Sequence, residues 1–225
     1  MSKAPGKSNE HGKLIAAAAR AALAPLGCRR VGRSRTWISD EGFWLIVIEF
    51  QPSGWEKGTY LNVGAMWLWQ DFRGFCFHHG YREDDFTPFE TAEQFIPNVE
   101  RKARRAAERV QELRAEFRSV GDVKRLLLKL ASRNDGRLYD AAVACGLTGE
   151  PELARDLFQR HDASVARFSW GPKRIAESLA LAGVLHDRAK FRDAVIDVIE
   201  ASRRLKGLQS DRERIAASFA LEPPG

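Results

Sequence analysis

The sequence predicts an α+β protein in which a four-stranded antiparallel meander, packed by two helices, precedes an all-α region of helical hairpins. Three observations lead to this prediction. Fifteen of the 22 Phe, Trp and Tyr residues lie between Trp37 and Phe95, and aromatic residues favour strands. Beyond Phe95 the chain becomes rich in Ala, Leu and Arg, which favour helices. The connections between the predicted strands are too short for the crossovers that parallel strands need.

Length and composition limit the possible classes of protein. The 225 residues permit two modest domains, and we expect an α+β domain over 1–120 and a helical domain over 121–225. With 44% hydrophobic and 29% charged residues, the composition is ordinary for a globular protein. The most apolar run, 43–48, has six residues, whereas a membrane-spanning helix needs roughly 18. We therefore expect no membrane partner.

The cysteines and the first residues favour a cytoplasmic protein. Cys28, Cys76 and Cys145 are odd in number and far apart, so they give no disulfide framework. Residues 1–12 are polar and lack the apolar segment of a signal peptide. A reducing cytoplasm is consistent with both observations.

The first half of the chain alternates between helix and strand signals. Residues 8–24 are expected to form a helix, because their apolar residues share one face and Pro25 and Gly27 close it. Pro52 and two glycines mark a hairpin loop over 51–58. The predicted strands comprise residues 35–38, 43–50, 59–69 and 73–81.

The second half is dominated by helix signals. A long helix is expected over 97–117, where apolar residues spaced alternately by four and three positions form one stripe suited to covering a sheet. Asp122 is expected to cap the next helix. The remaining helices, arranged as hairpins, are predicted over residues 122–132, 136–145, 151–161, 172–181, 188–205 and 210–219.

Short motifs in the first half carry a resemblance to a known family. They are Leu26-Gly27, Thr36-Trp37, Phe50-Gln51 followed by Ser53, Leu61-Asn62-Val63-Gly64, and the run from Phe95 to Arg118. On these motifs, residues 14–118 resemble the bacterial family called domain of unknown function 4304. The family has no established reaction, so the resemblance implies a fold and a bacterial setting without catalytic residues. The helical region is weakly similar to tetratricopeptide repeats at Gly149, Ala154 and Phe158.

Trp55 is the leading candidate for contact with a partner. It stands at the predicted hairpin tip between Gly54 and the charged pair Glu56 and Lys57. A Trp at this position either folds back on the sheet or is offered to a partner, and Trp is enriched at binding hot spots. We therefore treat Trp55, Glu56 and Lys57 as candidate partner-binding residues.

Two basic clusters form a candidate surface for nucleic acid. The chain has a net charge of +6 and a pI near 9.4, which is compatible with a nucleic-acid partner and also with ordinary solubility. Acidic residues four positions away can pair with the helical cluster, so a solvated helix face is the alternative. The clusters contain Arg29, Arg30, Arg33 and Arg35, and Arg101, Lys102, Arg104, Arg105 and Arg109.

One region is dense in possible metal ligands. Cys76 and His78 would share one face of a strand, whereas His79 would point the other way. The acidic residues 83–85 follow and are expected to form a solvated turn. A structural zinc ion needs four ligands, so we expect no metal and no cofactor.

Two cysteines are weighed as nucleophiles. Arg29 and Arg30 follow Cys28 and could lower the pKa of its thiol. Cys145 lies among alanines and a valine and is expected in the core. Neither cysteine has a histidine next to it in sequence to serve as a base.

Together these patterns favour a non-catalytic protein-binding module of the bacterial cytoplasm, with an immunity-like or scaffolding role and another protein as partner. The alternative is a nucleic-acid-binding protein that uses the arginines at 29–35 and 101–109. A third interpretation is an enzyme of undescribed type centred on Cys28, or on His78 and Asp84.

Overall fold

The structure, a computed structural model, describes residues 10–70 and 72–220. The chain divides into two compact units. The sheet unit comprises Met1–Glu41, Leu45–Met66 and Phe75–Arg114. The helical unit comprises Gly42–Trp44, Trp67–Gly74 and Ala115–Gly225, so it takes in two short segments that precede its helices in the sequence. The predicted domains, 1–120 and 121–225, stay a prediction.

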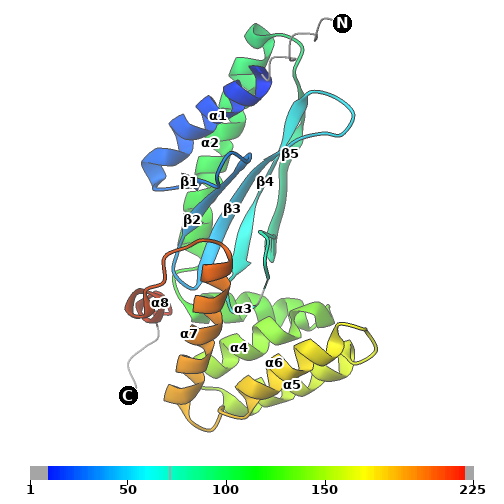
Figure 1. The fold of residues 1–225 in the computed structure, drawn as a ribbon, viewed down its shortest axis with the longest axis vertical. Helices are drawn as coiled ribbons and strands as arrows, with labels where there is room; N and C mark the ends of the chain where they lie inside the picture. The colour runs from blue at the N-terminus through cyan, green and yellow to red at the C-terminus, as the bar shows by residue number, and fades with distance from the viewer. Residues whose placement is uncertain (1–9, 71, 221–225) are drawn as a thin grey trace, which may run out of the picture. The chain divides into compact units, whose positions relative to one another are not determined.

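The α+β class is confirmed, but the antiparallel sheet has five strands and not the predicted four. The strand order is β1-β2-β3-β4-β5 (Figure 1). The additional strand has only two residues, which pair with Ile38 and Trp37 of β2. A two-residue strand has no measurable alternation, which is why the sequence pattern missed it. The strands are β1 (Arg29–Arg30), β2 (Thr36–Asp40), β3 (Trp44–Gln51), β4 (Gly58–Trp67) and β5 (His79–Pro88).

The last strand begins later than predicted. Residues 73–78 lie outside it, and β5 continues through the acidic residues 83–85 that were expected to form a turn. The prediction failed because it treated these carboxylates as solvated. Glu83 instead pairs with Arg105 and Arg109, and the charge of Asp84 is met by Lys102.

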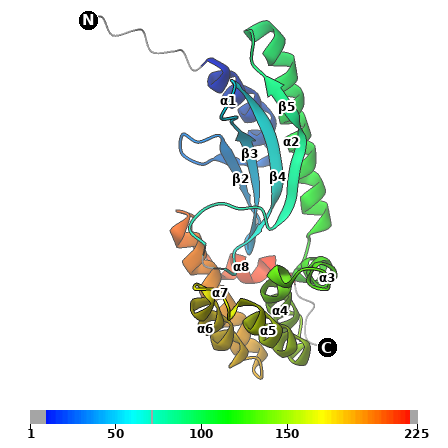
Figure 2. The same ribbon diagram turned by 90° about the vertical axis from the view of Figure 1, so that its right-hand side faces the viewer.

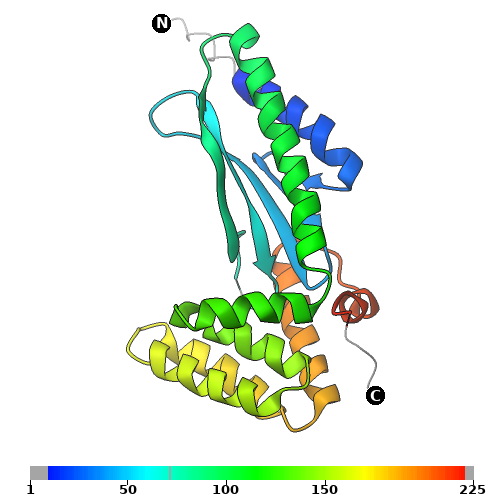
Figure 3. The same ribbon diagram turned by 180° about the vertical axis from the view of Figure 1, so that it is seen from behind.

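Two helices cover one face of the sheet. Helices α1 (Glu10–Leu23) and α2 (Ala92–Glu116) lie over the same face in the opposite views of Figures 1 and 3. The predicted helix over 8–24 matches α1, except that residues 8 and 9 lie outside the described part of the chain. Pro97 lies inside α2 and does not begin it as predicted. The predicted apolar stripe is confirmed as buried at Val99, Ala103, Ala106, Val110, Leu113 and Phe117.

Strands β4 and β5 approach each other closely at Gly64 of β4 and Gly80 of β5. These glycines pair directly across the strands. A Cβ at Gly64 would lie 2.3 Å from the carbonyl oxygen of His79, and a Cβ at Gly80 would lie 2.4 Å from that of Val63. Gly80 also has a φ of +109°, a backbone angle that residues other than glycine rarely adopt. The pairing of β4 with β5 therefore requires glycine at both positions.

We expect Gly80→Ala to lower the free energy of unfolding by at least about 2 kcal/mol, because the strained φ alone costs roughly 1–3 kcal/mol. Urea denaturation followed by circular dichroism measures this change. Gly54→Ala is the matched control, since a Cβ there meets nothing within 4 Å. An equally small effect of both substitutions would contradict the tight contact.

The helical unit contains the remaining helices. In the two views of Figures 2 and 3, α3 to α6 are stacked on one another, and α7 crosses the stack. Ser119 caps α3, and Asp122, predicted as this cap, instead completes a capping box at the third helical position. The hairpin arrangement stays a prediction. The helices are α3 (Val120–Ala131), α4 (Leu138–Leu147), α5 (Pro151–Val165), α6 (Gly171–Ala182), α7 (Arg188–Leu205) and α8 (Arg212–Ser218).

Aromatic residues from the two short segments form part of the core of the helical unit. Phe43 stacks on Trp69 with ring centroids 5.5 Å apart. Trp67 contacts Phe117 edge-on at 5.4 Å, and Phe43 also contacts Phe219 near the end of the described chain. All five rings are at most 3% exposed. Burial of such large rings is a major stabilising contribution in a small unit.

A buried carboxylate fixes one of these aromatic residues. Asp140 of α4 is fully buried, and its Oδ1 accepts a hydrogen bond of 2.9 Å from Trp69 Nε1. The same oxygen accepts a second hydrogen bond from Gln70 Nε2. The hydroxyl of Tyr139 donates to the carbonyl oxygen of Trp69 at 3.3 Å. Residues 69 and 70 are therefore held to α4 by both side-chain and backbone hydrogen bonds.

We expect Asp140→Ala to lower the free energy of unfolding by about 2–4 kcal/mol, because each buried donor left without its acceptor costs roughly 1–3 kcal/mol. Chemical denaturation followed by tryptophan fluorescence measures the loss. The control is Asp156→Ala on α5, where the exposed carboxylate pairs only loosely with Arg160 at 3.6 Å. Substitution of such a surface residue should change stability by less than about 0.5 kcal/mol. Equal stabilities would contradict the role of Asp140.

Candidate functional site

Trp55 is exposed at the tip of the loop between β3 and β4. Its side chain is 99% exposed, so it does not fold back on the sheet. The neighbouring Glu56 and Lys57 are exposed as well. Ser53 Oγ accepts a 3.1 Å hydrogen bond from the backbone N–H of Trp55, which fixes the local turn. Of the two alternatives that the sequence left open, the structure has the indole in solvent.

The base of this loop is anchored, in contrast to its tip. Arg35 Nη1 donates a hydrogen bond to the carbonyl oxygen of Gly58 at 3.2 Å. The backbone N–H of Phe89 donates one to the carbonyl oxygen of Lys57 at 2.9 Å. Thr59 Oγ1 donates to the carbonyl oxygen of Gln51 at 3.3 Å. The loop over 52–57, here called the Trp55 loop, therefore presents its indole from a fixed base.

Beside the Trp55 loop lies a sheet face that α1 and α2 do not cover. The guanidinium of Arg82 lies 3.8 Å from the ring centroid of Tyr60, and the rings of Tyr60 and Phe86 are 4.9 Å apart. Arg82 and Asn62 each donate to Gln51 Oε1 at 2.9 Å. We call these five residues the open sheet face. Sequence analysis missed it, although the alternation of Tyr60 and Asn62 with apolar residues was a usable signal.

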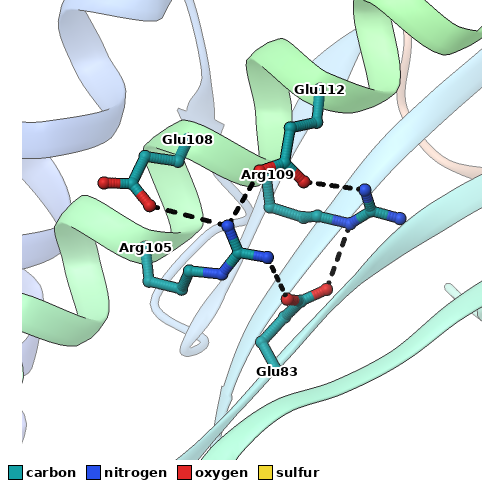
Figure 4. Close-up of polar contacts among 5 residues, drawn as sticks. All are labelled: Glu83, Arg105, Glu108, Arg109 and Glu112. Carbon is teal, nitrogen blue, oxygen red and sulfur yellow. Dashed lines mark hydrogen bonds and ion pairs between the residues drawn. The ribbon is translucent and has the colours of Figure 1, made fainter.

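The basic residues of α2 are largely neutralised by carboxylates. Arg105 pairs with Glu83 at 2.9 Å and with Glu112 at 2.8 Å, and Arg109 pairs with the same two carboxylates (Figure 4). Hydrogen bonds from Arg109 and Arg105 lower the pKa of Glu112. Hydrogen bonds to Glu112 and Glu83 raise the pKa of Arg105. These arginines form a structural clamp between α2 and β5.

The other cationic groups of α2 are engaged to different degrees. Lys102 is fully buried and donates to Asp84 Oδ2 at 2.9 Å. Burial acts to raise the pKa of Asp84, but the hydrogen bond and charge of Lys102 bring it below its usual value. Arg101 donates to the side chain of Asn98 at 2.7 Å. Arg104 has no carboxylate within 4 Å among residues 10–70 and 72–220.

The arginines at 29–35 are held by backbone carbonyl groups more than by carboxylates. Arg30 donates to the carbonyl oxygens of Ser34 at 2.6 Å and Arg33 at 2.9 Å. Arg35 Nη2 lies 2.8 Å from His11 Nε2, and burial followed by the charge of Arg30 lowers the pKa of Arg35. Arg29 and Arg33 are exposed. Two of the four arginines therefore have structural roles.

Cys28 and Cys145 are both buried thiols with raised pKa values. Cys28 is buried, and burial raises the pKa of its thiol despite the opposing charge of Arg114. The expectation that Arg29 and Arg30 would lower this pKa is therefore wrong, since desolvation dominates. Cys145 is buried as predicted, and burial raises its pKa to about 12.

Cys76 and His78 are brought together, with Cys76 Sγ 3.2 Å from His78 Nε2. They lie in the connection before β5 and not on a strand as expected. Within the described part of the chain, no group of three or more His, Cys, Asp or Glu residues is arranged to hold a metal ion. The pair by itself therefore provides two ligands of the four that a structural zinc ion needs.

Comparison with protein-family models, curated proteins and solved structures found no significant match to this chain. The resemblance to the domain of unknown function 4304 family stays a prediction. None of the helices that the structure describes has the length and apolar character needed to cross a bilayer.

We expect Trp55→Ala to change the melting temperature by less than about 2 °C, because an exposed side chain contributes within about 0.5 kcal/mol. The matched control is Trp37→Ala in β2, where the ring is only 4% exposed. Loss of this buried ring should cost about 3–5 kcal/mol and lower the melting temperature by many degrees. Thermal melts of the three proteins test the exposure of Trp55. Similar losses in both variants would refute it.

Proposed function

We propose that this protein is a non-catalytic protein-binding module of the bacterial cytoplasm, with an immunity-like or scaffolding role. The observation that carries the proposal is the 99% exposure of Trp55 on an anchored loop. The Trp55 loop and the open sheet face would together contact the partner protein. No catalytic residue, metal or cofactor is part of this proposal.

The exposed indole provides the expected binding energy. Burying such a ring removes on the order of 200 Å² from water, and tryptophan anchors dominate many interfaces. The anchored base supports this role, because a loop that is already ordered loses less conformational entropy when it binds. The structural requirements of the turn are met by Ser53 and Gly58. Trp55 makes no comparable contribution to the fold.

The surroundings of Trp55 fit a protein interface. Glu56 and Lys57 carry opposite charges beside the indole, as residues in the polar rim of an interface do. The open sheet face adds Arg82 and Tyr60, two residue types enriched at interfaces. A partner would complement this surface if it had an apolar pocket for the indole, bordered by a basic residue for Glu56 and an acidic residue for Lys57. The predicted helical hairpins agree with the proposal, since stacked hairpins commonly bind proteins.

The ion pairs of α2 argue against the nucleic-acid alternative at this helix. Phosphate binding requires cations that are free to replace counterions. Three of the five basic residues from Arg101 to Arg109 are held in ion pairs: Lys102 with Asp84, and Arg105 and Arg109 with Glu83 and Glu112.

The test is affinity capture from a bacterial lysate, followed by binding measurements with the purified partner. We expect Trp55→Ala to weaken partner binding at least tenfold, because truncating a hot-spot residue typically costs at least about 2 kcal/mol. Trp170→Ala is the matched control. It removes another exposed tryptophan, from the helical unit, and should leave this affinity unchanged.

Two outcomes would overturn the proposal. One is a partner that binds Trp55→Ala and the wild-type protein equally well. The other is binding to DNA or RNA with submicromolar affinity at physiological salt that is abolished by replacing Arg101, Arg104 and Arg105 with Glu. That result would support the nucleic-acid alternative, because each lost phosphate contact also reduces the salt dependence.

A further inference from the structure

A pocket of about 590 Å³ is formed by residues of the helical unit that belong to none of the sites considered above. Its wall is formed by residues before and within α4, by α5, by the connection from α5 to α6, and by α6. The volume is within the range of small-molecule sites. The residues that matter for its chemistry are Arg133, Asp135, His161, Phe168, Trp170 and Arg174.

The charge of the pocket wall favours an anion. Arg133 has no carboxylate within 4 Å among the residues that the structure describes, and Asp135 is the single acidic residue that lines the pocket there. Arg174 is held in place, since its Nη2 donates to Gln70 Oε1 at 3.0 Å and its Nη1 to Glu177 Oε2 at 2.9 Å. A guanidinium that is already positioned loses little freedom when it binds an anion.

The pocket wall contains a buried histidine. His161 is only 7% exposed, and its Nε2 has no hydrogen-bond partner within residues 10–70 and 72–220. The ring packs against that of Tyr139 at 5.4 Å. Burial, reinforced by the charge of Arg174, lowers the pKa of His161, although Asp162, Asp140 and Glu177 oppose this. Buried polar atoms are normally paired, so the unpaired Nε2 indicates a place for a ligand atom.

Two aromatic rings at the pocket are exposed and parallel. Phe168 and Trp170 stack with centroids 4.9 Å apart and planes 5° apart. They are 40% and 52% exposed, unlike the buried aromatic residues of the helical core. The guanidinium of Arg167 lies 5.0 Å from the centroid of Phe168. Exposed aromatic rings beside arginine are the groups on which nucleic-acid bases stack.

We propose that this pocket binds a small ligand that carries both a planar ring and an anionic group, of the nucleoside monophosphate class. The base stacks on Trp170, and the phosphate is bound chiefly by Arg133, since Arg174 shares its charge with Glu177. His161 Nε2 forms a hydrogen bond with the ligand. This site is independent of the Trp55 loop and assigns the protein a small-molecule ligand in addition to the proposed protein partner.

Isothermal titration calorimetry tests this site in the full-length protein. The probes are the adenosine, guanosine, cytidine and uridine 5′-monophosphates, with adenosine and inorganic phosphate titrated separately at the same ionic strength. We expect saturable binding of at least one monophosphate. Its affinity should be at least tenfold higher than that of the nucleoside or the phosphate, because the two halves bind to different walls of the pocket.

Variants separate the contributions of the ring and the phosphate. Trp170→Ala and Arg133→Gln should each weaken monophosphate binding at least tenfold without lowering the melting temperature, since both side chains lie at the surface of the pocket. The control is Arg160→Gln, which removes a charge from α5 outside the pocket. It should bind as the wild-type protein does. His161→Phe tests the unpaired nitrogen, and its melting temperature shows whether the fold is kept.

Three outcomes would overturn the inference. The first is no saturable binding of any of the four monophosphates at millimolar concentration. The second is equal binding of inorganic phosphate alone, unaffected by Trp170→Ala, which would identify a simple anion site. The third is equal weakening by Arg160→Gln, which would indicate a general charge effect. Trp55→Ala should leave monophosphate binding unchanged, so failure here is distinguishable from failure of the proposed protein-binding function.

Discussion

The helical unit depends on one buried carboxylate, Asp140, which accepts two hydrogen bonds. Asp140 is fully buried in α4, and its Oδ1 takes the indole N–H of Trp69 and the amide N–H of Gln70. Gln70 in turn accepts from Arg174. One chain of hydrogen bonds therefore runs from a buried acid to a pocket wall. In the low dielectric of a protein interior such hydrogen bonds reinforce one another, and removing one member is costly. The same hydrogen-bond chain fixes Trp69 in the aromatic core and holds Arg174 in the pocket wall.

The fold class and most elements were predictable because they rest on local signals. The apolar stripe of α2, the β-branched and aromatic residues of β3 and the alternation at the start of β4 are signals that a single sequence displays. The errors arose where a distant residue decides the local structure. Glu83 and Asp84 lie in a strand because Arg105, Arg109 and Lys102 neutralise them, and no periodicity reveals that pairing. The capping box of α3, in contrast, is a local pattern of Ser119 and Asp122 that the sequence displays, and assigning the cap to Asp122 overlooked it.

The candidate sites were predictable to different degrees for the same reason. Trp55 is flanked by glycines and charged residues, so its place on a loop could be inferred, although its exposure could not. The pocket of the helical unit was missed, because it combines residues from four separate segments whose spacing forms no motif. Basic residues on α2 were visible in the sequence, but the carboxylates that neutralise them include Glu83 and Asp84 of β5. Composition indicates charge, whereas only the fold decides which charges are free.

The two edges of the sheet restrict how any partner can bind. At one edge, β1 is two residues long and cationic. At the other, β5 carries Arg82, Glu83, Asp84 and Asp85 and ends at Pro88. Short strands, charges and proline all oppose pairing with a strand from another chain. The sheet is thereby protected from growing by strand addition, whether in aggregation or in complex formation. Recognition of the proposed partner would then rely on side chains and not on backbone hydrogen bonds with an added strand.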